Sequence, residues 1–133
     1  MNVIVCLDNS DGMAFNNRRQ SMDRILRERL LSVCRGSRLL MDAYSCSQFE
    51  NSEAITPDEN FLENAGENDY CFVERHSFLP DKVKKLIVFR WNRDYPADLK
   101  LGFDIASSGF RLVQMCEFAG YSHEKITMEV YEK

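Results

Sequence analysis

Residues 1–44, MNVIVCLDNSDGMAFNNRRQSMDRILRERLLSVCRGSRLLMDAY, decide the fold class, because they place a helix between two apolar strands. Residues 1–7 are apolar and rich in β-branched side chains, and the Asp-Asn-Ser-Asp-Gly run that follows is typical of a turn. Residues 38–44 (RLLMDAY) form the second apolar run. We therefore expect two buried strands separated by a helix, as in an α/β protein.

The helix between these strands is amphipathic. Ser21 is its expected N-cap, and Asp23 lies in the first turn, where a carboxylate suits the helix dipole. Gly36 supplies the C-terminal stop. Five apolar residues fall on one helical face and are expected to pack on the sheet: Met22, Ile25, Leu26, Leu30 and Val33.

The second half of the chain contains four more strand-like segments. Residues 70–75 (YCFVER) and 85–91 (KLIVFRW) are apolar, the latter enough to be central in a sheet. Residues 110–118 and 125–131 alternate in polarity, which predicts a terminal antiparallel pair. This order predicts an α/β fold with a mixed central sheet of five or six strands and two or three helices, in a single domain 1–133.

Residues 50–69 are expected to form an acidic rim segment that contains one short helix over 57–65. Thr56 as N-cap, Pro57 at the first helical position and Glu59 three residues after Thr56 make a capping box. Few large apolar side chains anchor this helix, so we expect it to pack at the edge of the fold.

Composition bounds the class of the protein. A chain of 133 residues, 44% apolar and 29% charged, is typical of one ordered domain. No apolar run approaches the roughly 18 residues of a membrane span, and no basic segment precedes an apolar one at the N-terminus, so neither a membrane protein nor a signal peptide is expected. The net charge of -4 argues against a general nucleic-acid binder. The five cysteines form no C-x-x-C pair, which favours structural thiols in a cytoplasmic protein.

The charges are segregated along the chain. Residues 18–38 contain seven arginines and two acids, whereas residues 39–74 contain nine acids and no lysine or arginine. One interpretation is a solvated helix face whose arginines pair with the acidic segment after folding. The other is a local anion site near residues 18–24.

The polar run NNRRQS at 16–21 is the best candidate for a ligand site. It connects the first strand to the helix, and ligands of α/β folds bind where strands end. Two adjacent arginines can each fork to a phosphate or carboxylate, and the backbone N–H groups of a first helical turn favour anions. The residues expected to hold the ligand are Asp8, Asn17, Arg18, Arg19, Ser21 and Asp23. Alternatively, these side chains cap the helix and pair with the acidic segment.

Three further groups offer alternative chemistry. Asp8, Asp42 and one acid from 50–63 could converge on Mg²⁺ in a phosphoesterase or nuclease, although no spacing requires it and no resident metal is predicted. His123 lies in a loop and is either a general base or a surface residue. Trp91 lies among basic and aromatic residues and either stacks on bases or closes the core.

Several segments resemble the dihydrofolate reductase family. They are residues 3–17 (VIVCLDNSDGMAFNN), 21–24 (SMDR), 38–49 (RLLMDAYSCSQF) and 126–133 (ITMEVYEK). Asp23 stands close to the position of the family's substrate-binding acid. The resemblance implies a dihydrofolate reductase-like fold or a similar two- or three-layer sandwich.

The chain departs from that family at residues that carry its chemistry. Ala14 replaces the second glycine of the family's Gly-Ile-Gly loop, and Asp42-Ala43 stand where a Gly-Arg pair holds the NADPH phosphates. An aspartate has the wrong charge for a phosphate contact. The Gly-Gly pair that lets the backbone approach the pyrophosphate is also missing. The resemblance therefore implies degraded NADPH motifs and no working reductase chemistry.

A second resemblance spans nearly the whole chain. Residues 16–24, 70–74, 91–98 and 122–132 are similar to runs in short bacterial proteins of unknown function, some of which carry an automatic ribonuclease Z label. That enzyme family needs a histidine cluster for two zinc ions. Because the chain has two histidines in total, we expect no zinc centre.

The sequence thus predicts a small cytoplasmic α/β domain, bacterial by resemblance, that binds a small anionic ligand of nucleotide or pterin type. No membrane and no nucleic acid are expected as partners. One alternative is a protein–protein interaction module, including a homodimer, that uses an edge strand or the cationic helix. The other is a metal-dependent phosphoesterase or nuclease that uses Asp8 and Asp42.

Overall fold

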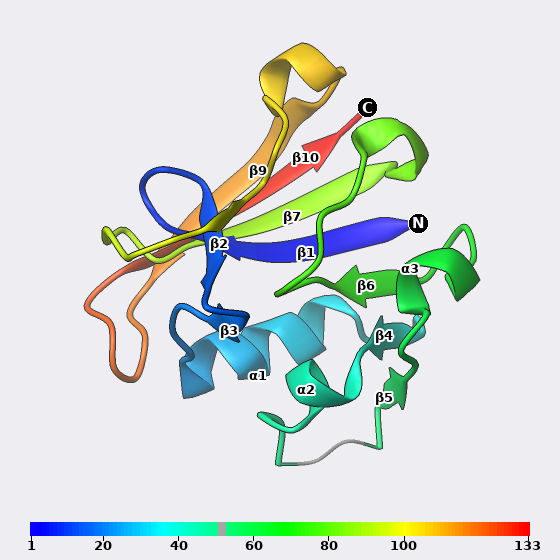
Figure 1. Ribbon diagram of the computed structural model, residues 1–133, viewed down its shortest axis with the longest axis horizontal. Helices are drawn as coiled ribbons and strands as arrows, with labels where there is room; N and C mark the ends of the chain where they lie inside the picture. Colours follow the sequence, from blue (N-terminus) through cyan, green and yellow to red (C-terminus); the bar gives the residue numbers. More distant parts are fainter. Residues whose placement is uncertain (51–52) are drawn as a thin grey trace.

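The computed structural model describes residues 1–50 and 53–133, and its main element is a seven-stranded mixed sheet (Figure 1). The strand order is β5-β4-β6-β1-β7-β10-β9. The bounds are β1 (Asn2–Leu7), β4 (Leu39–Met41), β5 (Ile55–Pro57), β6 (Tyr70–Phe72), β7 (Lys85–Arg90), β9 (Arg111–Phe118) and β10 (Ile126–Glu132).

A second, three-stranded sheet and three helices complete the described structure. The small sheet has the order β3 (Arg18–Arg19), β2 (Gly12–Phe15) and β8 (Leu99–Lys100). The helices are α1 (Arg24–Val33), α2 (Ala43–Cys46) and α3 (Phe61–Asn64), with 3₁₀ turns at Pro80–Lys82 and Ala106–Ser108. Within the described ranges, no helix has the length and apolar character to cross a membrane. The predicted mixed α/β architecture is confirmed, and the main sheet gains β5 as an additional edge strand.

Strand β1 is the middle strand of the main sheet. It pairs in parallel with β6 and β7, and β4 pairs in parallel with β5 and β6. Strand β10 is antiparallel to β7 and β9, as the terminal alternation predicted. Ile4 packs in one core cluster with Leu26 and Leu30 of α1, whereas Val3 and Val5 pack in the opposite cluster. Both faces of β1 are buried, which explains its continuous apolar sequence.

Helix α1 begins two residues later than its sequence predicted. Asp23, not Ser21, is the N-cap: its backbone is extended and its carboxylate accepts hydrogen bonds from the N–H groups of Ile25 and Leu26. Met22 therefore precedes the helix and is 52% exposed, so it is not part of the buried face. Both residue types cap helices well, and tertiary contacts of Asp23 described below decide between them.

The helix expected over 57–65 is also shorter than predicted. Pro57 is the last residue of the edge strand β5, where proline is tolerated because its missing N–H is not needed for pairing with another strand. Helix α3 starts only at Phe61. Residues 51–52 of the expected acidic rim segment lie outside the described residues.

The connection between β1 and α1 is a hairpin and not an irregular loop. Asn16 and Asn17 join β2 to β3 with φ angles of 51° and 58°. Two consecutive left-handed residues form the tight turn that suits a two-residue hairpin, and asparagine tolerates this backbone better than most residues. The hairpin places Arg18 and Arg19 on a defined strand near α2, where Arg19 contacts Tyr44 (Figure 1).

Candidate functional site

Three parallel strands of the main sheet end in buried carboxylates. Asp8 follows β1, Asp42 follows β4, and Glu74 lies two residues after β6. None of the three is more than 7% exposed. Ligands of α/β folds bind at this end of the strands, so the contacts of these carboxylates define what the site can accept.

Asp8 shapes the turn between β1 and β2 and holds Gln20. Its Oδ1 accepts hydrogen bonds from the N–H groups of Ser10 and Gly12 at 2.8 Å, and its Oδ2 accepts one from Gln20 Nε2 at 2.9 Å. Burial acts to raise the pKa of Asp8, but these hydrogen bonds outweigh burial and lower the pKa below the ordinary value of 3.8. Asp8 is therefore a structural anion in the floor of the site.

Glu74 pairs with Arg19 from the β2–β3 hairpin. Arg19 Nε lies 3.0 Å from Glu74 Oε2, and Glu74 Oε1 accepts hydrogen bonds from Ser45 Oγ at 2.8 Å and Gln48 Nε2 at 3.0 Å. The Arg19 guanidinium also lies over the Tyr44 ring, 4.2 Å from its centroid. The hairpin is thereby held to α2 and to the end of β6.

Asp42 is held in the same way by the segment after β6. Arg75 Nη2 and His76 Nε2 lie 3.4 Å and 3.0 Å from Asp42 Oδ2. Burial acts to raise the pKa of Asp42, but the N–H of Ser45 and the side chains of His76 and Arg75 lower it below 3.8. Arg75 covers the opposite side of Tyr44 at 3.8 Å, so this ring lies between two guanidinium groups.

The strand-end crevice is therefore filled by side chains of the chain itself. Two arginines of residues 18–38 pair with the acidic segment: Arg19 binds Glu74, and Arg38 binds Asp69 at 2.6 Å. Both lie outside α1, whereas the pairing interpretation concerned arginines on the helix face. Such pairing does not account for Arg18, which is exposed and has no ion pair in the part of the chain that the structure describes.

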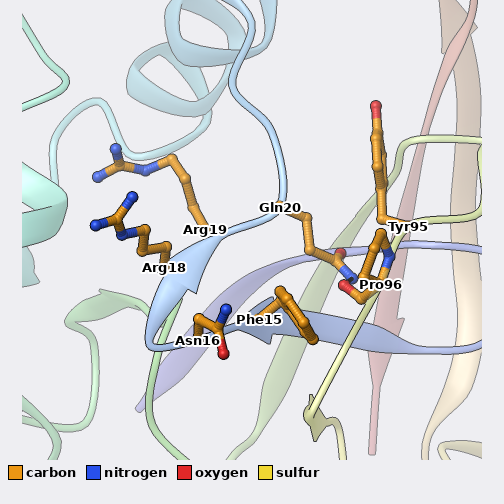
Figure 2. A pocket seen from close by; sticks show the side chains of 7 residues that line it. All are labelled: Phe15, Asn16, Arg18, Arg19, Gln20, Tyr95 and Pro96. Carbon is orange, nitrogen blue, oxygen red and sulfur yellow. Dashed lines mark hydrogen bonds between the residues drawn. The ribbon is translucent and has the colours of Figure 1, made fainter.

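An open cleft of about 470 Å³ lies beside this filled crevice. Its lining residues come from the β2–β3 hairpin and from the loop after β7: Phe15, Asn16, Arg18, Arg19, Gln20, Tyr95 and Pro96. Figure 2 shows the side chains of Arg18 and Arg19 extending toward one end of the view, and the rings of Phe15 and Pro96 at the other. The cleft thus combines a cationic end with an apolar, partly aromatic end.

Asp23, the N-cap of α1, is a buried anion that accepts several hydrogen bonds. Besides capping α1, it accepts hydrogen bonds from the loop between β9 and β10, and four backbone N–H groups reach it in all: those of Ile25, Leu26, Tyr121 and Ser122. Burial acts to raise its pKa, but the hydrogen bonds from Tyr121, His123, Ser122 and Leu26 lower it far below 3.8. Asp23 is therefore a buried anion at neutral pH.

His123 links Asp23 to two hydroxyl groups. Its Nδ1 lies 2.9 Å from Asp23 Oδ2, while its Nε2 lies 3.0 Å from Ser21 Oγ and 3.3 Å from the Tyr95 hydroxyl. The ring is stacked on Trp91 with 4.6 Å between centroids. His123 is 5% exposed and Trp91 is 3% exposed. The interpretations of His123 as a surface residue and of Trp91 as a base-stacking surface are therefore wrong. Trp91 closes the core, and its broad indole covers the histidine.

The six predicted ligand residues separate into four places in the structure. Arg18 and Arg19 line the cleft. Asp8 lies behind it and contacts it through Gln20. Ser21 and Asp23 belong to the His123 cluster, and Asn17 forms the hairpin turn and offers its carbonyl to Arg75.

Several residues of the site are absent from that prediction: Phe15, Asn16, Gln20, Tyr44, Glu74, Tyr95 and Pro96. Gln20 and Asn16 lie inside the run NNRRQS and could have been included with it. Tyr95 and Glu74 are 76 and 55 residues from Arg19, so only the sheet topology brings them to the hairpin.

The alternative magnesium site requires Asp8, Asp42 and one acid from residues 50–63 to lie together. The oxygens of each carboxylate are used by separate partners within the chain. Among residues 1–50 and 53–133, no group of three or more histidine, cysteine, aspartate or glutamate side chains is placed to hold a metal ion. The metal-dependent phosphoesterase or nuclease therefore has no geometric support in the described residues.

Acid is expected to destabilise the fold through these aspartates. Asp8, Asp23 and Asp42 all have lowered pKa values in the folded state, so each contributes stability above the unfolded-state pKa that is lost as the pH falls through the folded-state pKa. Urea titrations should show the free energy of unfolding falling between about pH 4 and about pH 2. A free energy that stays level over this range would contradict the assignment of these carboxylates as structural anions.

Comparisons with known proteins identify the fold. No protein-family model and no curated protein sequence matches the chain. A solved dihydrofolate reductase from Enterococcus faecalis, complexed with NADP(H) and RAB-propyl, has a similar structure with a TM-score of 0.67. The match covers 98% of this chain and 94% of that one at 8% sequence identity. The dihydrofolate reductase-like fold that the sequence motifs implied is confirmed. At 8% identity, the similarity is evidence of a shared fold only.

Proposed function

We propose that the protein binds a small anionic ligand, of nucleotide or pterin type, in the cleft between the β2–β3 hairpin and the loop after β7. The observation that carries this proposal is the exposed guanidinium of Arg18 at the cationic end of the cleft, without an ion pair in the described chain. Arginine forks to phosphate and carboxylate oxygens with strong, charge-assisted hydrogen bonds. An anionic group of the ligand would take this position.

The opposite end of the cleft suits a flat heterocycle. Phe15 is 42% exposed, which is unusual for a phenylalanine on a strand, and Tyr95 and Pro96 lie across from it. Gln20 Nε2 is fixed by Asp8, while Gln20 Oε1 is buried and accepts no hydrogen bond within the described residues. A ring N–H of a pterin or nucleobase would supply the missing donor once the Gln20 amide turns toward the cleft, because Oε1 is enclosed as the structure places it.

Reductase chemistry with NADPH is not part of the proposal. Asp42 occupies the position where the family resemblance places a phosphate-binding glycine, and its carboxylate is anchored by Arg75 and His76. Tyr44, clamped between Arg19 and Arg75, fills the space beside it. A cofactor phosphate would meet a buried anion there, which supports binding without hydride transfer.

A thermal-shift panel tests the proposed function. Folic acid, adenosine monophosphate and NADP⁺ are added to the full chain, with sodium sulfate at equal ionic strength as the control. A ligand present at 100 times its Kd stabilises the folded state by about 2.7 kcal/mol, so at least one member of the panel should raise Tm by several degrees. No shift with any of them would overturn the proposal.

A homodimer is a second candidate function, favoured by the edge strand β9. Leu112, Val113 and Met115 are 48%, 43% and 56% exposed on this edge. Antiparallel pairing with a second copy, centred on Gln114, would set Val113 against Met115 and Arg111 against Glu117. Exposed edge strands pair readily with other chains.

Charge placed at the centre of this edge is expected to separate the two copies. Met115→Lys would put an ammonium group opposite Val113 of the second copy, so light scattering should show a mass falling from twice 15.5 kDa to 15.5 kDa. Leu79→Lys, at a residue that is 75% exposed outside β9, should leave the mass unchanged. A wild-type protein that is monomeric at millimolar concentration would contradict this candidate.

A further inference from the structure

Ser21, His123 and Asp23 form a continuous hydrogen-bonded chain. Ser21 Oγ lies 3.0 Å from His123 Nε2, and His123 Nδ1 lies 2.9 Å from Asp23 Oδ2. These are the contacts by which a histidine accepts a proton from a serine while a carboxylate orients its ring. The three residues come from two distant segments of the chain: Ser21 and Asp23 precede α1, and His123 lies between β9 and β10.

The surroundings fix the protonation pattern that such a chain requires. Asp23 is ionised and accepts hydrogen bonds only, so the contact with Nδ1 requires a proton on Nδ1. In the neutral ring, Nε2 then carries the lone pair and faces Ser21. The stacking of the ring on Trp91 and the burial of its side chain, which is 4% exposed, hold it in this orientation.

The serine end of the chain is the accessible end. Ser21 is half-buried, whereas Asp23 is 2% exposed. Ser21 directly follows Gln20, and the Tyr95 hydroxyl that also reaches Nε2 belongs to a residue of the cleft. Figure 2 shows the Tyr95 hydroxyl pointing away from the arginine end of the cleft. Ser21 and His123 are not among the residues that line the cleft, so the hydroxyl side of His123 lies next to the cleft and outside its lining.

We propose that Ser21 is the nucleophile of an acyl-transfer site that hydrolyses small carboxylic esters. Ser21 Oγ forms a bond to the ester carbonyl carbon while His123 Nε2 takes the hydroxyl proton. The bond from that carbon to the leaving alkoxide breaks, and His123 returns the proton to this oxygen, which releases the alcohol. Water then attacks the acyl-serine with the same proton transfers, and the carboxylic acid and Ser21 are regenerated.

This activity is independent of the proposed anion binding. A small neutral ester needs no contact with Arg18. Ester hydrolysis can therefore be present when no compound of the thermal-shift panel raises Tm, and absent when one of them does. His123 is the general base of the step, and Asp23 is a positioning residue that acts through it.

A fluorophosphonate probe tests the proposal on the full chain. Attack by Ser21 Oγ on phosphorus would form a stable P–O bond and release fluoride, and peptide mass spectrometry should locate the adduct on Ser21. Ser21→Ala removes the nucleophile on which His123 acts, so it should lose the adduct and at least about 100-fold of the p-nitrophenyl acetate hydrolysis above background, since the general-base contribution of about 10²–10⁴-fold is lost with it. Ser107→Ala, which removes an exposed serine far along the chain, should keep both.

The site of the adduct makes the test independent of the stability of any variant. Wild-type protein that forms no adduct, or forms it on a residue other than Ser21, overturns the proposal. So does a Ser21→Ala protein with native circular dichroism and undiminished ester hydrolysis. Loss of labelling in Tyr95→Phe together with an adduct on Tyr95 would assign the nucleophile to the tyrosine and overturn it equally.

Discussion

Asparagine in place of Asp23 is expected to lower the free energy of unfolding by about 3–5 kcal/mol. Asp23 is 2% exposed, and its carboxylate caps α1 and joins it to the loop between β9 and β10 through the N–H groups of Tyr121 and Ser122. The amide would keep the shape but lose the charge. Its NH₂ group would point at N–H donors, and the hydrogen bond to His123 Nδ1 would weaken.

Urea titration at pH 7 measures this loss. Asp104→Asn makes the same change of charge at an exposed residue and should alter the free energy of unfolding by less than about 0.5 kcal/mol. The difference between the two variants should shrink as the pH falls toward 2, because the Asp23 carboxyl of the unfolded wild-type chain then takes up a proton and the stability that comes from its lowered folded-state pKa is lost. If the two variants are equally stable at pH 7, Asp23 does not hold the fold together.

Methionine in place of Arg19 is expected to cost about 2–3 kcal/mol, somewhat less than the loss of a fully buried pair because the guanidinium is 18% exposed. Glu74 would keep Ser45 and Gln48 as donors but would lose its cation in a site where it is 7% exposed. The stacking of Arg19 on Tyr44 would also be lost.

A double-mutant cycle separates the ion pair from these packing effects. Glu74→Gln removes the charge left behind by Arg19→Met, so the double variant should be more stable than the sum of the single losses by about 1 kcal/mol or more. Strictly additive losses would show that Arg19 and Glu74 do not interact, and that the strand-end crevice is not closed by this pair.

The sheet could be predicted from the sequence because the burial of a strand determines the pattern of apolar residues within that strand. The segments that form β1 and β7 are continuous apolar runs, and apolar and polar residues alternate in β10. The burial of each strand can therefore be inferred from its own residues. Edge strand β5 has three residues and ends in Pro57. Its pairing depends on β4 rather than on its own side chains, and its capping-box residues favoured a helix instead.

The candidate site was predictable only in part. The run at 16–21 marks the place because polar residues seldom follow a buried strand in such number. What each residue does there depends on contacts across the chain: Arg19 meets Glu74 over 55 residues, and Asp23 meets His123 over 100. Ser21 and Asp23 are equally good caps locally, and the N–H groups of the distant loop select Asp23.

Calorimetric titration of folic acid and adenosine monophosphate into wild-type, Arg18→Glu and Arg35→Glu proteins tests the central claim most directly. Both variants make the same change of charge at an exposed arginine, but only Arg18 lines the cleft. The account predicts that wild-type protein binds at least one of the two, that Arg18→Glu weakens this binding at least about tenfold, which is 1.4 kcal/mol, and that Arg35→Glu leaves it unchanged. Wild-type protein that binds neither compound, or equal weakening by both variants, would contradict it.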